Sequence, residues 1–199
     1  MIIRRDEAFR VVCEILTPVN VNEAKVGTGI FVCSPAGINT MYEWIVTANH
    51  VAKETTNDTK IVIANQAGKA TTLPLTLFGK LSNWRHHPIA DISAFRIEFN
   101  SLNEPYLDKR FLPLDHFNLE ENAVSRDYEL TSIGFPNGLG VGKNDYFSPF
   151  SFRSYASSGF VTLLRADTNT PSTFFVWRIR VLAAILDAQF LIWVMKRTA

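Results

Sequence analysis

The stretch Trp44-Ile45-Val46-Thr47-Ala48-Asn49-His50-Val51-Ala52 decides how this chain is interpreted. Its apolar first half predicts a short strand, and Thr-Ala followed by a single histidine predicts that a helical turn begins there. Gly27-Thr28-Gly29-Ile30-Phe31-Val32 precedes this stretch, and Ala90-Asp91-Ile92-Ser93 follows it. The unperturbed pKa of histidine is about 6.5, so a histidine can serve as a base near neutral pH. A lone histidine is more often structural than catalytic, so the interpretation of His50 and Asp91 depends on the motifs in which they lie.

Strand signals dominate the rest of the sequence. Short apolar or alternating runs are each bounded by Asn, Gly, Pro or Asp clusters, which is typical of an all-β sandwich or barrel. Strong helical periodicity is absent before residue 176. The predicted strands are Phe9–Leu16, Gly29–Cys33, Glu43–Thr47, Lys60–Ala64, Thr72–Phe78, Ile92–Phe99, Tyr128–Ile133, Ser157–Leu164 and Ser172–Val176. We therefore expect an all-β fold.

The 199 residues can form one ordinary domain or two small barrels that share a cleft. We predict a first β unit over residues 1–102 and a linker with two prolines over 103–122. A partial second β unit follows over 123–176, and residues 177–199 form an atypical apolar tail. Within this tail the run from Val181 to Met195 is shorter than the roughly 20 residues that a membrane span needs.

Composition limits the classes of partner. The hydrophobic fraction of 47% is enough for a packed core, and the net charge of +1 comes without a basic stripe, so we expect no nucleic-acid partner. Cys13 and Cys33 both lie in predicted strands; one disulfide is possible, but two buried free thiols are favoured. The N-terminal residues contain no apolar signal core, so we expect a cytoplasmic protein. We predict no metal or cofactor, and the oligomeric state stays open.

The order of the first motifs resembles that of the trypsin-like (chymotrypsin-fold) serine peptidases. In that family a general-base histidine comes first, its orienting aspartate second and the nucleophilic serine last. Thr47-Ala48 before His50 matches the family, whereas Asn49 stands where the family usually has Ala or Lys. The resemblance implies that His50 is the catalytic base, that Asp91 orients it, and that the substrate is a peptide or protein.

Two later segments resemble the family's second barrel. Gly134-Phe135-Pro136 stands where a strand leads into a turn before the site, and Ser158-Gly159-Phe160-Val161 resembles the strand that precedes the serine loop. The resemblance covers about Ala8 to Val176. It implies two Greek-key β-barrels, of which the second is incomplete.

The Gly-Asn-Ser-Gly turn that supplies the family's nucleophile and oxyanion donors is missing. After Val176 the chain reads Trp177-Arg178-Ile179-Arg180-Val181-Leu182-Ala183-Ala184. The remaining serines, such as Ser151, Ser154, Ser157, Ser158 and Ser172, lack the glycine context. A single oxyanion donor contributes about 3–4 kcal/mol of transition-state stabilisation. We therefore expect the chain as written to be inactive as a protease.

The genetic code offers an explanation for this loss. The codons for Ala184-Ile185-Leu186-Asp187-Ala188-Gln189-Phe190 are GCN-ATH-YTN-GAY-GCN-CAR-TTY. Triplets that start one nucleotide earlier can spell Gly-Asn-Ser-Gly, then Cys or Arg, then Pro, then Val or Ile. We interpret this as a reading frame that shifted between about Val176 and Ala184, which would make the tail an out-of-frame product and the peptidase C-terminally truncated.

Two other interpretations stay open. The chain could be a protease-like module that lost its nucleophile by selection and now binds a peptide or a protein. It could also associate with a membrane through its tail, although the tail lacks a polar face for an interfacial helix and is short for a span. His86, His87 and His116 lack further metal ligands at a plausible spacing, so we predict that they are surface residues.

Overall fold

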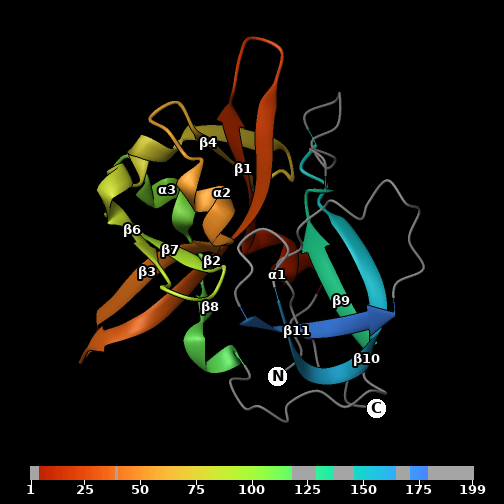
Figure 1. Ribbon diagram of the computed structural model, residues 1–199. Helices are drawn as coiled ribbons and strands as arrows, with labels where there is room; N and C mark the ends of the chain where they lie inside the picture. The colour runs from red at the N-terminus through yellow and green to blue at the C-terminus, as the bar shows by residue number, and fades with distance from the viewer. Residues whose placement is uncertain (1–4, 39, 118–128, 137–145, 165–170, 179–199) are drawn as a thin grey trace.

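The computed structural model describes residues 5–38, 40–117, 129–136, 146–164 and 171–178 (Figure 1). Within these residues, most of the regular structure is strand and the helices are short, which confirms the all-β prediction. The helices are α1 (Arg5–Arg10), α2 (Asn49–Lys53) and α3 (Glu104–Leu107). Three single 3-10 turns cover Leu75–Leu77, Leu81–Asn83 and Leu114–His116.

The first sheet has eight strands, and its hydrogen-bonded path runs in the order β5-β4-β1-β2-β3-β7-β6. The eighth strand, β8, pairs with β2 in parallel, and the other pairs are antiparallel. The bounds are β1 Val12–Pro18, β2 Ala24–Gly37, β3 Thr40–Thr47, β4 Lys60–Ala64, β5 Ala70–Pro74, β6 Trp84–His86, β7 Ser93–Arg96 and β8 Leu112–Pro113. As described, the path is open between β5 and β6 rather than a closed ring.

The second sheet has three antiparallel strands in the order β11-β10-β9. They are β9 (Glu129–Gly134), β10 (Phe150–Leu164) and β11 (Pro171–Arg178). In Figure 1 these strands stand beside the first sheet, with α1 between the two groups. The segment predicted as a linker contains α3 and β8, and β8 pairs with β2 of the first sheet.

Two apolar clusters explain why β1 has almost no polar alternation. Cys13 and Ile15 belong to a core that also contains Phe31, Ile45 and Phe95. The neighbouring residue Val12 belongs to a second core, which gathers Ile30, Val32 and Val62 of the first sheet with Ile133, Phe135 and Phe147. A strand that is buried on both faces reads as a continuous apolar run. The second core also joins the two sheets.

The thiols are free, as predicted, with Cys13 buried and Cys33 half-buried. His86, His87 and His116 are exposed, which agrees with their assignment to the surface. No helix in the described parts of the chain is long and apolar enough to cross a bilayer. The predicted tail over 177–199 begins within β11, which ends at Arg178, and the rest of it, including the segment interpreted as frame-shifted, lies outside the described residues.

Candidate functional site

Strand register brings His50 and Asp91 together. β3 and β7 are antiparallel neighbours, and Thr47 at the end of β3 pairs with Ser93 at the start of β7. His50 follows β3 within the first turn of α2, and Asp91 lies just before β7. Because antiparallel neighbours place the end of one strand beside the start of the other, both residues emerge at the same edge of the sheet.

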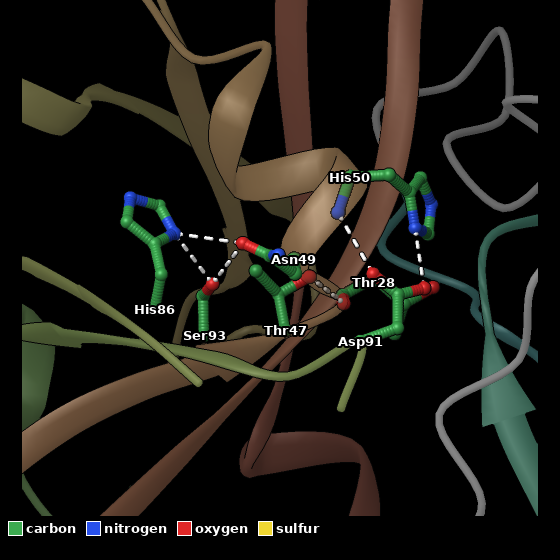
Figure 2. Close-up of polar contacts among 7 residues, drawn as sticks. All are labelled: Thr28, Thr47, Asn49, His50, His86, Asp91 and Ser93. Atoms are coloured by element: carbon green, nitrogen blue, oxygen red, sulfur yellow. Dashed lines mark hydrogen bonds and ion pairs between the residues drawn. The ribbon is translucent and has the colours of Figure 1, made fainter. Parts of the chain in front are cut away.

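The two side chains form a direct pair (Figure 2). His50 Nδ1 lies 2.7 Å from Asp91 Oδ2, and the backbone N–H of His50 donates to Asp91 Oδ1 at 3.0 Å. The side chains are 36% and 26% exposed, so the pair is partly open to solvent. The predicted proximity of His50 and Asp91 is confirmed. With Nδ1 donating to the carboxylate, the lone pair of the imidazole is on Nε2.

Gly27 allows β2 to pass directly beneath α2. A Cβ atom at this position would lie 2.4 Å from Val51 Cγ1 and 2.9 Å from Val51 Cγ2. Real Cβ atoms do not approach that closely, so only glycine fits without displacing Val51, the residue after His50. The first glycine of the Gly27-Thr28-Gly29 motif therefore sets the position of the candidate base.

Thr28 connects this motif to the second sheet. Its carbonyl accepts a hydrogen bond from the Thr47 hydroxyl at 2.8 Å, and its own hydroxyl accepts one from the Phe135 backbone N–H at 3.0 Å. A Cβ on Gly134 would lie 2.8 Å from Thr28 Oγ1, so glycine is needed at this contact as well. The Gly134-Phe135-Pro136 segment thus lies where the two sheets meet.

A second polar cluster lies next to the His50–Asp91 pair (Figure 2). Asn49, His86 and Ser93 are mutually within hydrogen-bond distance, with separations of 2.8 to 2.9 Å. Sequence reasoning missed this cluster: it treated Asn49 as a minor departure from a motif and His86 as a surface residue. The sequence does contain a partial signal, because Asn49 directly precedes His50 and Ser93 lies two positions after Asp91.

His87 has a separate structural task. Its Nδ1 accepts hydrogen bonds from the backbone N–H groups of Ile89 and Ala90 at 3.2 and 2.8 Å. These bonds close the turn that leads to Asp91. The two histidines before Asp91 therefore make specific contacts, although both are exposed.

The serines considered as nucleophiles lie in strands. Ser151, Ser154, Ser157 and Ser158 belong to β10, and Ser172 belongs to β11. A strand position does not provide the turn of backbone N–H donors that an oxyanion hole requires.

The cysteines are poor substitutes for a serine nucleophile. Burial raises the pKa of the Cys13 thiol far above its ordinary value. Burial raises the pKa of Cys33 as well, and the carboxylates of Glu43 and Asp115 raise it further. Because the thiolate is the reactive form, the raised pKa values disfavour both thiols as nucleophiles near neutral pH.

Other site types find little support in the described chain. Among its residues, no group of three or more His, Cys, Asp or Glu side chains could hold a metal ion. A hollow of about 670 Å³ lies over β3, β6 and β7, but its lining does not include His50 or Asp91. Arg96 lies over the Tyr42 ring at 4.5 Å within this lining. The hollow is therefore separate from the His50–Asp91 pair.

Comparison with known proteins gives structural neighbours only. This chain is similar to the MamO protease domain from Magnetospirillum magneticum, with 13% identity, a TM-score of 0.48, and coverage of 83% of this chain and 68% of that one. A structure named GrC has 13% identity and a TM-score of 0.45 over 79% of this chain and 64% of that one. Neuropsin, a serine protease expressed in the limbic system of mouse brain, has 12% identity and a TM-score of 0.42 over 86% and 78%.

No protein-family model matches the sequence, and no curated protein matches it. At 12–13% identity and TM-scores below 0.5, the three structures carry no argument about what this chain does.

Proposed function

We propose that this chain carries the base half of a serine-endopeptidase site, with His50 as general base and Asp91 as the carboxylate that orients it. The supporting observation is the double contact of Asp91, whose Oδ2 lies 2.7 Å from His50 Nδ1 while its Oδ1 accepts the His50 backbone N–H. This arrangement fixes both the ring and the backbone of the base. It also selects the tautomer that has its basic lone pair on Nε2.

The chemistry follows from that tautomer. A serine hydroxyl beside Nε2 would give its proton to His50 as its oxygen attacks the carbonyl carbon of a peptide bond. The imidazolium formed would be stabilised by the Asp91 carboxylate, which keeps its charge throughout. His50 would then return the proton to the leaving amine, and a water molecule would release the acyl group by the same route. The substrate class proposed is a peptide or protein.

The chain as written is proposed to lack the nucleophile. One nucleotide out of frame, codons 184–190 are compatible with Gly-Asn-Ser-Gly followed by Cys or Arg, Pro, and Val or Ile. In the same frame, Ile192-Trp193-Val194-Met195-Lys196 gives Leu or Met, then Gly, then a residue with codon NAT, then Glu. The Gly and Glu are forced because Trp and Met each have one codon. Asn or Asp after that Gly would form a hairpin-turn signal.

The test compares this chain with a version in which one nucleotide is inserted within codons 177–183. Both proteins are incubated with casein and with a fluorophosphonate probe. The corrected protein should cleave and become labelled, and this chain should do neither. In the corrected protein, His50→Ala should lower kcat by roughly 10⁶-fold and Asp91→Asn by roughly 10⁴-fold, by analogy with well-studied triads.

Two results would overturn the proposal. Labelling of the present chain at a serine would show that another residue is the nucleophile. An inactive, unlabelled but folded corrected protein would favour the alternative of a non-catalytic peptide- or protein-binding module.

A further inference from the structure

The cluster of Asn49, His86 and Ser93 joins three elements beside the candidate site. Ser93 Oγ donates to Asn49 Oδ1 at 2.9 Å, and His86 Nδ1 lies 2.8 Å from both of those oxygens. Asn49 begins α2, His86 ends β6 and Ser93 begins β7. In Figure 2, His86 and Ser93 lie on one side of Asn49, and the His50–Asp91 pair lies on the other.

Strand register explains why these residues meet. Ser93 is the antiparallel partner of Thr47 on one side and of His86 on the other. Thr47 is fully buried and its hydroxyl donates to the Thr28 carbonyl, while Ser93 is 1% exposed. The Ser93 hydroxyl is therefore held at a buried crossing of three strands. A hydroxyl at such a place is costly unless it is hydrogen-bonded.

The protons of the cluster can be assigned from its bonding. An amide oxygen can only accept, so Asn49 Oδ1 takes the Ser93 hydroxyl proton. The Ser93 oxygen then has only acceptor capacity left, and both neighbours of His86 Nδ1 are acceptors. His86 Nδ1 must therefore carry a proton and share it between the two oxygens. His86 and His87 therefore differ in tautomer: His86 Nδ1 carries a proton, whereas His87 Nδ1 accepts a hydrogen bond.

We propose that Asn49, Ser93 and His86 are positioning residues for the His50–Asp91 pair. Asn49 is the residue before His50, and Ser93 is two residues after Asp91, so their hydrogen bond ties the two backbones at a fixed separation. His86 holds both partners from the exposed side. The proposed catalytic role of the pair is assumed here, but the geometric role of the cluster can be measured without it.

The experiment uses the full chain and proton NMR of the imidazole N–H groups. The Nδ1–H proton of His50 should be visible and slow to exchange with water while Asp91 accepts it. Ser93→Ala and Asn49→Ala should each speed its exchange roughly tenfold, because the loss of a buried hydrogen bond loosens the Asp91 backbone. Ser101→Ala, at an exposed serine, is the matched control and should leave the exchange rate unchanged.

His86 separates positioning from simple folding stability, because its side chain is exposed and its replacement leaves no core cavity. His86→Asn places an amide N–H near the position of Nδ1 and should preserve the slow exchange of the His50 proton. His86→Gln places its N–H near the position of Nε2 and should speed the exchange several-fold. Equal melting temperatures of the two variants would show that the difference is local.

The outcomes are distinguishable from those of the proposed function. Exchange at His50 that is unchanged in folded Ser93→Ala, Asn49→Ala and His86→Gln proteins would overturn the positioning role. If Ser93→Ala unfolds, the His86→Asn and His86→Gln pair decides the question. In the frame-corrected protein, Ser93→Ala should lower kcat and leave KM nearly unchanged. An inactive corrected protein with the NMR effects intact would refute the proposed function and leave the cluster's role standing.

Discussion

The two sheets contribute to the candidate site in different ways. The first sheet presents His50 and Asp91 and surrounds them with side chains that bond to one another. The second sheet contacts this region through Phe135, and on β9 the buried Ser132 hydroxyl has no hydrogen-bond partner among the described residues. The proposed base, His50, is thus held by contacts within one sheet. The proposed nucleophile would come from sequence after β11, where the in-frame chain contains no serine.

Gly27→Ala tests the first of these regions and should have the largest effect on stability. The added methyl group would lie 2.4 Å from Val51 Cγ1, so the Val51 side chain, β2 or the turn carrying His50 must move. Overpacking of a filled site costs about 3 kcal/mol at the upper end of its usual range. Urea denaturation should show this loss, and the His50 Nδ1–H resonance should broaden.

The matched control for Gly27→Ala is the double variant Gly27→Ala/Val51→Ala. It removes the two methyl groups that the new Cβ would meet, so it should recover most of the stability lost in Gly27→Ala. If the single Gly27→Ala variant is as stable as the parent and its His50 signal is unchanged, β2 does not constrain α2 in the way we describe.

Much of the first sheet could be predicted from local sequence. The run Lys60–Ala64 was predicted with the bounds it has in the structure, because it is apolar and ends at Asn65 and Gly68. β6 was missed, since it has only three residues and two of them, Arg85 and His86, are polar. Its existence depends on β7 beside it, which local patterns do not encode.

The candidate site was predictable only in part, for the same reason. His50 and Asp91 were found because each lies in a recognisable local motif. No single local motif contains Asn49, His86 and Ser93, and the cluster forms because strand register brings their three segments together. In the second sheet, β10 begins at Phe150 rather than at Ser157, because the alternation of Phe150 and Phe152 with polar residues extends the strand.

Glu14→Gln tests the face of β1 that lies toward the second core, and its effect on folding stability should be intermediate. Glu14 is 4% exposed and pairs in register with Thr28 and Val62. Burial raises its pKa from 4.5 to about 7. Below pH 4.5 the Glu14 carboxyl is protonated in both the folded and the unfolded protein. Above pH 4.5 the unfolded chain loses this proton at a lower pH than the folded protein does. Stability should therefore fall as pH rises from 4.5 to about 7, and then level off.

The measurement is urea denaturation of the parent and of Glu14→Gln at pH 5 and pH 8. The parent should lose about 2 kcal/mol more than the variant between these two pH values. Comparing the two proteins cancels the other groups that titrate in this range. A pH dependence that is the same in both would show that the Glu14 carboxyl is ionised in the folded protein without cost.

Thr28→Val should have the smallest effect, and it addresses the connection between the two sheets directly. Valine keeps the shape of threonine but removes the oxygen that accepts the Phe135 N–H at 3.0 Å. Thr28 and Phe135 are 5% and 3% exposed, so water cannot readily replace the lost acceptor. An unsatisfied buried donor costs about 1 kcal/mol at the low end of its range.

Amide hydrogen exchange should speed at Phe135 in Thr28→Val. The hydrogen bond from the Thr47 hydroxyl to the Thr28 carbonyl should persist, because that carbonyl belongs to the backbone. Thr28→Ser retains the oxygen and should behave like the parent. Equal Phe135 exchange in the valine and serine variants would mean that apolar packing alone joins the sheets, and that the Gly27-Thr28-Gly29 motif serves only the base half of the site.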